Sequence, residues 1–585
     1  MIRRKIKDIK MHPMVRWYDL GQIVGTGLKV AISSILGSRN DVRIVQAISA
    51  SGIYYHDYSI INPTGSNVST SDEPEKKEEI WIDYVSDTGD GWNSTYGIAY
   101  YKSQPTLRLN DFETQRGELL IFGGDEVYPA PSRKNYNEKL IIPYETAFGN
   151  ENEELKPHVY AVPGNHDWYD GLVAFSRLFF SDLKREYKAW VTNQRRSYFA
   201  LKLPHNWWLL GSDGQLESEL DTPQMEFFRA IAETKMKSGD KVILCTAEPG
   251  WIYAEKYRTI DESIDQSDLI YLQDEIFKKN GIEIKVFLSG DLHHYRRHEE
   301  SSKESGVQKI IAGGGGAFLH PTHGFDVSKI HERNSDDEST WREFTLKKSY
   351  PSVKDSKKLN RLNFFFLFRN PGFGIITGLL YFMTAWMISA SVNFRKPQNI
   401  FFDSFHLTFK AFMDNPFAAL WILTVFALFI LMNDTHSRIY KWIGGIAHCT
   451  IHFILIFWTA IISSFVAEYL NPGEEFTYFL VSALFVFSGG WIFGSVIMGF
   501  YLFISLNIFG RHDNEAFSAL RIQDYKNFLR LHINKSGKLT IFPIKLERVP
   551  RKWKLNDNSN PDVKSIIVPL DGSQPELIEE PVTLN

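Results

Sequence analysis

Four short polar clusters in the N-terminal half of the chain carry the residue types of a metal-dependent hydrolase. They are Asp87-Thr88-Gly89-Asp90, Gly124-Asp125-Glu126-Val127-Tyr128, Gly164-Asn165-His166-Asp167 and Gly290-Asp291-Leu292-His293-His294. Each combines a glycine, which permits a tight turn, with oxygen or nitrogen donors. One such cluster is more often a plain turn, but four in succession supply enough ligands for two metal ions. We therefore predict a dinuclear metal site.

The clusters need strands to position them, and apolar runs typical of buried strands precede them. These runs are residues 80–85, 119–122, 159–162, 242–245 and 284–288, and four of the five lead directly into a cluster. Loops at strand ends converge on one crevice in layered folds. The pattern predicts an α/β domain over residues 42–347 with the clusters along one edge.

With these motifs, the chain resembles the calcineurin-like metallophosphoesterase superfamily. The pattern of that superfamily is Asp-x-His, Gly-Asp-x-x-Asp, Gly-Asn-His-Asp/Glu, a lone His and Gly-His-x-His. The similarity covers residues 75–320, and Gly164-Asn165-His166-Asp167 is its most specific piece. The resemblance implies a two-sheet α/β sandwich flanked by helices and the hydrolysis of phosphate mono- or diesters.

Two of the clusters are similar to the purple acid phosphatase variant of this pattern. Asp87-x-Gly89 lacks the first His, and Gly124-Asp125-x-x-Tyr128 ends in a tyrosine. In that variant a tyrosine phenolate binds one metal. A free phenol has a pKa near 10, so Tyr128 would need a hard ion such as ferric iron. Packing of Tyr128 beneath the site is the alternative.

Two departures concern the second metal. Ala247 stands where the lone His belongs, and Asp291 replaces the first His of the last cluster. Glu248 is a candidate stand-in, and His320 or His323 are further candidates for the missing ligand. A site this rich in oxygen favours manganese or magnesium over zinc.

The resemblance also implies roles for single residues. The implied ligands are Asp87, Asp125, His293 and Tyr128 for the first metal, and Asp125, Asn165 and Asp291 for the second. A hydroxide bridging ions about 3.5–4 Å apart would attack phosphorus in line. His166 would stabilise or protonate the leaving oxygen, held in position by Asp167. Asp90 and His294 are either supporting residues or solvated neighbours. Manganese or iron is favoured, with zinc or magnesium as alternatives.

The C-terminal half predicts membrane spans, each of which needs roughly 20 mainly apolar residues. Residues 373–392, 416–432, 443–465 and 476–508 meet this within a domain at 371–510. We expect an all-α bundle of four helices, or five if the last run is broken at Gly489-Gly490.

Charged residues predict the orientation of these spans. The linker at residues 348–370 is basic, whereas the loop after the third span carries Glu468, Glu474 and Glu475 and no basic residue. This places the enzyme domain in the cytoplasm, where the two cysteines, Cys245 and Cys449, would stay reduced. We expect residues 511–585 to be a cytoplasmic tail with a β-hairpin at 528–546 and a disordered end.

Residues 1–41 form a separate N-terminal segment. Residues 15–37 mix many apolar residues with Asp19 and Lys29, which is typical of an amphipathic segment. It would lie either on the membrane surface or against the neighbouring domain.

Composition narrows the function further. The 585 residues carry a net charge of −4, which argues against nucleic-acid binding. Three hypotheses remain. The first is a phosphohydrolase for a phosphate ester, such as a lipid-linked one, at the cytoplasmic membrane face, and the second is a tethered phosphatase for soluble nucleotides. The third is a catalytically impaired metal-binding sensory or structural module coupled to the membrane domain. We favour an active enzyme in contact with membrane lipids, and the sequence leaves its oligomeric state open.

Overall fold

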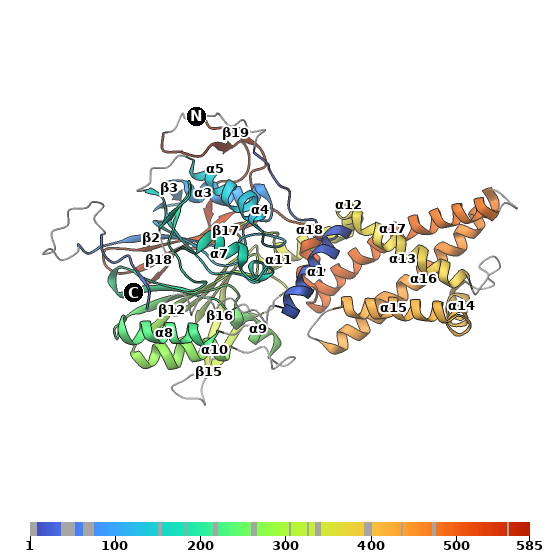
Figure 1. Cartoon of the computed structure of the whole chain (residues 1–585), viewed down its shortest axis with the longest axis horizontal. Helices are drawn as coiled ribbons and strands as arrows, with labels where there is room; N and C mark the ends of the chain where they lie inside the picture. The colour runs from blue at the N-terminus through green and yellow to red at the C-terminus, as the bar shows by residue number, and fades with distance from the viewer. Residues whose placement is uncertain are drawn as a thin grey trace.

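The computed structural model describes residues 9–36, 53–61, 75–149, 155–181, 184–214, 220–258, 266–302, 306–324, 327–333, 341–390, 400–433, 437–470, 475–557 and 561–585. Figure 1 shows a domain of sheets and helices beside a bundle of long helices. The two parts meet at α1 (Leu20–Leu36), α12 (Phe366–Arg369) and α18 (Asp513–Leu520).

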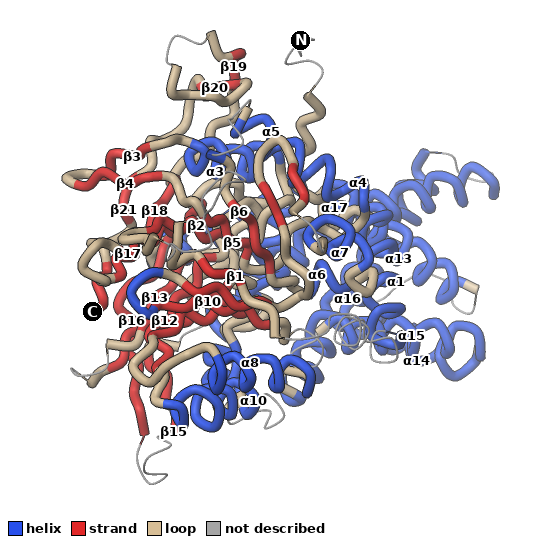
Figure 2. Tube along the Cα trace, turned by 60° about the vertical axis from the view of Figure 1, so that its left-hand side comes forward, coloured by secondary structure: helices blue, strands red, loops and turns tan. Residues whose placement is uncertain are grey.

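The first part is a sandwich of two large sheets (Figure 2). The first sheet has the order β1 (His56–Asp57), β9 (Phe199–Lys202), β10 (Trp207–Ser212), β11 (Lys241–Thr246), β12 (Glu283–Ser289), β14 (Gln308–Ala312), β13 (Tyr295–Glu300), β16 (Trp341–Tyr350) and β15 (Lys329–Arg333). Strands β10, β11, β12 and β14 are parallel neighbours.

The second sheet brings together strands from distant parts of the chain. Its order is β21 (Glu576–Leu577), β18 (Leu539–Leu546), β17 (Lys526–Ile533), β2 (Ile80–Val85), β5 (Leu119–Phe122), β6 (His158–Ala161), β8 (Val191–Thr192) and β7 (Arg185–Glu186), and β22 (Val582–Leu584) also pairs with β18. Two small ribbons complete the strands: β3 (Thr106–Leu109) with β4 (Phe112–Gln115), and β19 (Trp553–Leu555) with β20 (Ile567–Pro569).

Helices cover both outer faces of the sandwich. On the second sheet lie α3 (Trp92–Ser103), α4 (Arg133–Asn135), η3 (Tyr136–Ile141), α5 (Ile142–Phe148), α6 (Asn165–Trp168) and α7 (Val173–Phe179). On the first sheet lie α8 (Thr222–Thr234), α9 (Gly250–Tyr257), α10 (Ser267–Tyr271), η6 (Leu272–Phe277) and η7 (Lys278–Asn280), and η5 (Pro204–Asn206) joins β9 to β10.

The alternation of side chains along β2 explains this layering. Ile80, Ile82 and Tyr84 point into the core between the sheets, whereas Trp81 and Val85 point into the core beneath the helices. Successive side chains of a strand face opposite sides, so a strand with apolar residues at every position must be covered on both faces. The predicted two-sheet sandwich flanked by helices is confirmed.

The C-terminal residues correct one expectation. The predicted hairpin forms as β17 and β18, but β17 pairs with β2 inside the second sheet and does not belong to a separate tail. The expected disordered end is wrong as well, since β22 at Val582–Leu584 pairs with β18. Alternating buried residues on both hairpin strands supply part of the sandwich core, which explains why this segment is folded.

The helical bundle consists of α13 (Pro371–Ser389), α14 (Ile400–Asp414), α15 (Pro416–Met432), α16 (Arg438–Leu470) and α17 (Glu475–Phe509). Of the described helices, α13, α16 and α17 are long and apolar enough to cross a membrane. We expected at least four spans. The fourth candidate, α15, is apolar but has only 17 residues. It ends before Asn433, whose side-chain amide donates to the Phe429 carbonyl at 3.1 Å. These helices fit a membrane domain.

Helix α17 continues through Gly489-Gly490, where a break had been considered. The small residues serve close packing: a Cβ on Gly490 would lie 2.6 Å from Tyr381, and one on Gly494 would lie 2.4 Å from Thr377. Small residues let helix backbones approach closely in membranes. The basic stretch before the bundle, expected as a linker, forms α11 (Val353–Asn360), η8 (Arg361–Phe365) and α12.

Candidate metal centre

The register of the second sheet brings three of the polar clusters to one edge. Val85 of β2 lies opposite Phe122 of β5, which lies opposite Ala161 of β6. These parallel strands therefore end level with one another, and the loops carrying Asp87, Asp125 and His166 start side by side. The fourth cluster joins them from β12 of the other sheet, because the backbone N–H of Asp291 donates to both carboxylate oxygens of Asp87 at 3.2 and 3.0 Å.

Three predicted ligands share an uncommon backbone conformation. Asp87, Asp125 and Asp291 have φ values of 56°, 54° and 66°. Non-glycine residues rarely adopt this left-handed conformation, and aspartate is among those that tolerate it. Such conformations cluster at functional sites. Each aspartate lies two or three residues beyond the end of its strand, where the chain turns.

The Tyr128 phenol lies at the centre of the cluster. Its oxygen is 3.0 Å from Oδ1 of Asp87, 3.0 Å from Oδ2 of Asp125 and 2.9 Å from Nε2 of His293. Within the described ranges, no three His, Cys, Asp or Glu side chains are spaced as an assembled metal site. The four groups predicted for the first metal nevertheless converge on a single point, with Tyr128 at its centre.

The electrostatics of this cluster suit a cation. Burial, followed by the neighbouring Asp291 carboxylate, raises the pKa of Asp87. Burial, followed by Asp167 and Asp87, raises the pKa of Asp125. Burial, followed by the Asp125 and Asp87 carboxylates, raises the pKa of Tyr128. A bound cation would relieve this repulsion and favour the ionised forms, so the residues present fit a metal.

His293 is oriented as a metal-binding imidazole would be. Its Nδ1 donates to the Phe318 carbonyl at 2.7 Å, which leaves Nε2 toward Tyr128. Burial lowers the pKa of His293, so the ring is neutral. A hydrogen bond from the other ring nitrogen commonly fixes the tautomer of a metal ligand.

His166 lies beside this cluster, but the residue expected to orient its ring, Asp167, does not contact the ring nitrogens. Its Nδ1 donates to the Pro129 carbonyl at 2.8 Å, and its backbone N–H donates to Asp125 at 2.8 Å. Asp167, which we expected to orient the imidazole, accepts from the Gly164 N–H at 2.9 Å and from the phenol of Tyr136. The carboxylate points beneath its own loop, so it holds that loop and not the His166 ring.

The residues predicted for the second metal are less closely gathered. Asn165 is exposed at the first position of α6, and Oδ2 of Asp291 accepts from the phenol of Tyr253. The Cβ of Ala247 would lie 2.8 Å from a Cβ on Gly124, so Ala247 does sit at the cluster without offering a donor. The Glu248 carboxylate lies close enough to raise the pKa of Tyr253.

The other candidate residues lie around the cluster. The His320 ring stacks on His293 at 3.8 Å between centroids, and His294 is buried nearby. His323 is directed away, with Nδ1 2.7 Å from the Ser356 hydroxyl of α11. Asp90 accepts from the Val15 N–H at 2.8 Å.

Lys526 is a residue that the motifs could not predict. It begins β17 and is fully buried, and its ammonium donates to the Ala317 carbonyl. Burial lowers its pKa to about 8, although Asp90 and Asp87 are close enough to raise it. Lys526 lies two residues before the hairpin predicted at residues 528–546, and nothing in the sequence indicates this neighbourhood, which depends on the pairing of β17 with β2.

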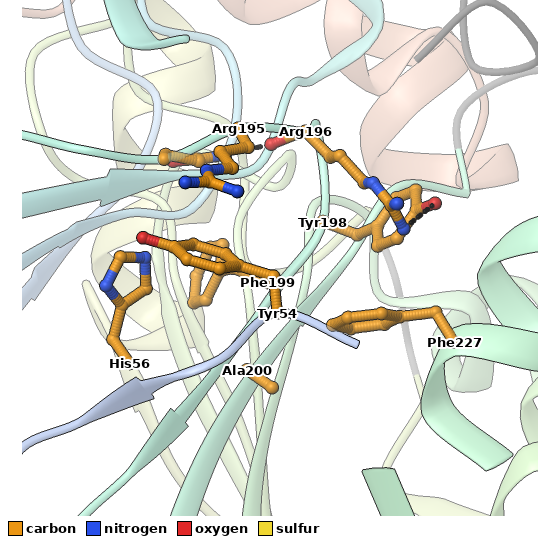
Figure 3. Close-up of a pocket in the computed structure, with 9 residues that line it drawn as sticks. Tyr54, His56, Arg195, Arg196, Tyr198, Phe199, Ala200 and Phe227 are labelled. Carbon is orange, nitrogen blue, oxygen red and sulfur yellow. Dashed lines mark hydrogen bonds between the residues drawn. The ribbon is translucent and has the colours of Figure 1, made fainter. Parts of the chain in front are cut away.

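A small cavity lies elsewhere in the same domain, between Tyr54, His56 of the edge strand β1 and residues of β9 (Figure 3). Two arginines line it, but Arg195 lies over the Tyr54 ring at 3.9 Å while Arg196 turns toward the Tyr198 hydroxyl at 3.1 Å. Because the guanidinium groups diverge, this cavity does not form an anion site.

Comparisons with known proteins address the two-sheet domain. Residues 80–295 match the family model of the calcineurin-like phosphoesterases. No curated protein matched the chain. Similar solved structures include GAP50, the anchor in the inner membrane complex of Plasmodium (12% identity over 48% of this chain and 94% of that chain, TM-score 0.30). Others are the purple acid phosphatase PPD1 of yellow lupin (14%, 49% and 49%, TM-score 0.30) and PhoD (9%, 45% and 60%, TM-score 0.28).

Proposed function

Because this chain contains a calcineurin-like phosphoesterase domain at residues 80–295, we propose that it is a membrane-anchored, metal-dependent enzyme that hydrolyses phosphate mono- or diesters. The observation that carries the proposal is the convergence of Asp87, Asp125 and His293 on the Tyr128 oxygen within 3.0 Å, beside His166. Buried acidic groups around one point, next to an imidazole, suit phosphoester hydrolysis.

The proposed ligands follow from this arrangement. The first metal would be held by Asp87, Asp125, Tyr128 and His293. The second would be held by Asp125, Asn165 and Asp291, and Glu248 is an alternative ligand for it. Two metal ions bound there would neutralise charge on the phosphate and activate a water molecule as nucleophile. The oxygen-rich donor set favours manganese or iron, with magnesium or zinc as alternatives.

His166 is proposed to protonate the leaving oxygen. Burial lowers its pKa to about 4, so the imidazole is neutral in the free protein. The Pro129 carbonyl fixes Nδ1 as the donor and leaves Nε2 for the substrate. A phosphate dianion beside the ring would favour the protonated form, and its proton could then pass from Nε2 to the alcohol oxygen.

Contacts between the site and the bundle support a substrate at the membrane face, including a lipid-linked ester. Helix α18 directly follows α17, and its Asp513 lies 3.9 Å from Lys256 of α9. The Asp513 carboxylate is near enough to act on the pKa of Asp291. The basic residues before α13 favour the cytoplasmic side.

The test is hydrolysis of p-nitrophenyl phosphate and bis(p-nitrophenyl) phosphate by the full-length protein with manganese, iron, zinc or magnesium. Phosphatidic acid and phosphatidylglycerol in mixed micelles provide the lipid arm. Asp125→Asn should abolish turnover, and His166→Ala should lower it by about 10²–10⁴. Asp240→Asn, a buried aspartate bonded to Trp208 at 2.9 Å, is the matched control and should do neither. Equal turnover in all variants would contradict the proposal.

Ala247 favours one second candidate, a catalytically impaired metal-binding module coupled to the bundle. The position that should supply a histidine offers a methyl group to the cluster. This candidate predicts bound metal that Asp125→Asn removes, together with no turnover in any metal.

A further inference from the structure

The N-terminal strap, defined as residues 9–19, crosses the catalytic domain next to the candidate metal centre. The His12 carbonyl accepts from the Trp92 N–H at 2.8 Å, and the Val15 N–H donates to Asp90 at 2.8 Å. Met14 is buried so closely against Gly91 that a Cβ there would lie 2.5 Å from it. The strap is therefore fixed along its length.

Two side chains of the strap reach the predicted site residues. Val15 packs in one buried cluster with Tyr128 and Ala317. The Trp17 ring lies edge-to-face with the His166 imidazole, with centroids 5.9 Å apart, and packs against Phe318 at 6.0 Å. His166 also contacts the Tyr169 ring at 4.8 Å. Trp17 thus completes an aromatic wall around the imidazole.

The indole nitrogen of Trp17 is an unsatisfied donor. Nε1 is buried, although the residue as a whole is only partly buried, and it has no hydrogen-bond partner among the described residues. An indole N–H can only donate, and a buried donor without an acceptor costs free energy. An oxygen-rich ligand beside His166 would provide the missing acceptor.

The strap continues directly into the membrane domain. The Tyr18 ring packs on Phe366 at 5.0 Å and on Phe373 at 5.5 Å, and its hydroxyl donates to the Glu515 carbonyl at 3.0 Å. Helix α1 follows at Leu20, packs beside α13 and exposes Leu20, Ile23, Val24 and Leu28. Next to the first span, the partner that suits these exposed side chains is the lipid bilayer.

We propose that Trp17 is a substrate-binding residue of the phosphoesterase site. Its indole N–H donates to an oxygen of the phosphate ester, and its ring covers the alcohol part of the substrate. Because the strap leads to a bilayer-facing helix, the favoured alcohol carries an apolar chain that enters from the membrane. This inference rests on the proposed function and adds a contact that lies outside the matched residues 80–295.

Trp17→Phe tests the hydrogen bond, because it keeps a ring and removes the donor. A hydrogen bond to a charged group suggests that KM for bis(p-nitrophenyl) phosphate and for micellar phosphatidylglycerol should each rise about tenfold, with a smaller change in kcat. Trp17→Ala should raise KM further, and more for the lipid than for the soluble ester. Trp553→Phe is the matched control, since its N–H already donates to Asn93 at 3.1 Å.

A binding measurement separates this inference from the proposed function. Calorimetry of inorganic phosphate with the manganese-loaded protein should show affinity about tenfold weaker for Trp17→Phe than for the wild type or Trp553→Phe. This readout needs no turnover. If wild-type turnover depends on metal and Trp17→Phe matches the wild type in both KM and phosphate affinity, the inference is wrong and the function stands. If Asp125→Asn retains turnover, the proposed function itself fails.

Discussion

The Arg530 guanidinium binds the Asp83 carboxylate inside the second sheet, with Nε 2.8 Å from Oδ1 and Nη2 3.4 Å from Oδ2. The two residues face each other on β17 and β2, and both are buried. This ion pair ties the C-terminal hairpin to the strand that leads to Asp87. The two-sheet domain therefore depends on residues that follow the membrane domain in the chain.

Arg530→Met should destabilise the two-sheet domain strongly. It leaves Asp83 charged and buried without its partner, a change that typically costs about 3–5 kcal/mol. Thermal unfolding of the purified protein should show a lower Tm and earlier loss of turnover. The double variant Asp83→Leu/Arg530→Met should recover part of this loss, because neither member of the ion pair is then left buried without the other. An unchanged Tm in Arg530→Met would show that the pair does not stabilise the fold.

Tyr128→Phe tests the centre of the metal cluster. If the phenol is a ligand, the variant should lose bound metal, measured by elemental analysis after dialysis, because one of four converging donors is removed. Tyr96→Phe is the matched control, since this buried phenol donates to the backbone carbonyl of Ile567 at 2.7 Å and contacts none of the predicted ligands through its hydroxyl. It should retain the metal content of the wild type. Full metal content in Tyr128→Phe would support the alternative that Tyr128 only packs beneath the site.

Asp167→Asn and His166→Ala should fail in different ways. His166→Ala removes the proposed proton donor, so kcat should fall by about 10²–10⁴ with metal content kept. Asp167 holds its loop through the Gly164 N–H and Tyr136, so Asp167→Asn should lower Tm and metal affinity together. A loss of kcat alone in Asp167→Asn would instead support the role first expected from the sequence, that of orienting His166.

Lys102 makes stability depend on pH. It is buried beside Tyr144, and burial lowers its pKa from 10.5 to about 7, against the attraction of Asp83 and with the repulsion of Arg530. Between these pH values the unfolded chain holds a proton that the folded protein has released, so this group's contribution to stability rises with pH across the window. Burying the charged ammonium of Lys102 therefore costs on the order of 5 kcal/mol of folding free energy below pH 7.

Lys102→Met removes that cost. Its Tm should exceed that of the wild type near pH 6.5, and the difference should shrink as the pH approaches 10. Lys241→Met, at a lysine that is only partly buried, provides the comparison and should show a smaller pH-dependent difference. If the difference in Tm between Lys102→Met and the wild type stays constant over this pH range, the buried Lys102 does not titrate as proposed.

Membrane orientation can be measured by cysteine labelling, because Cys245 and Cys449 are both buried. Ser301→Cys is exposed on the catalytic domain, and Glu468→Cys is exposed at the far end of α16. If the enzyme domain is cytoplasmic, a membrane-impermeant maleimide should label Glu468→Cys in intact cells and Ser301→Cys only after lysis. The reverse pattern would place the enzyme domain outside.

Local patterns in the sequence were sufficient to predict many of the strands, turns and helices of this protein. The strand at Ile80–Val85, the turn clusters that follow the strands and the long apolar helices are all short-range features. Each depends on neighbouring residues, such as an apolar run, a glycine or a helix-length hydrophobic segment. The resemblance of Gly164-Asn165-His166-Asp167 to a known motif then indicated which chemistry to expect.

Only the tertiary structure decided where distant segments meet. Nothing near Lys526 or Arg530 indicates that β17 pairs with β2, because strand pairing is a long-range choice that many alternating segments could satisfy. Nothing near Trp17 indicates His166 as its neighbour. The orientation of Asp167 was likewise a matter of packing, since adjacency in sequence does not determine which way a side chain points once its loop is folded. The sequence determined the strands, the helices and the chemistry of the motif residues. Long-range packing determined which of these residues lie together in the site.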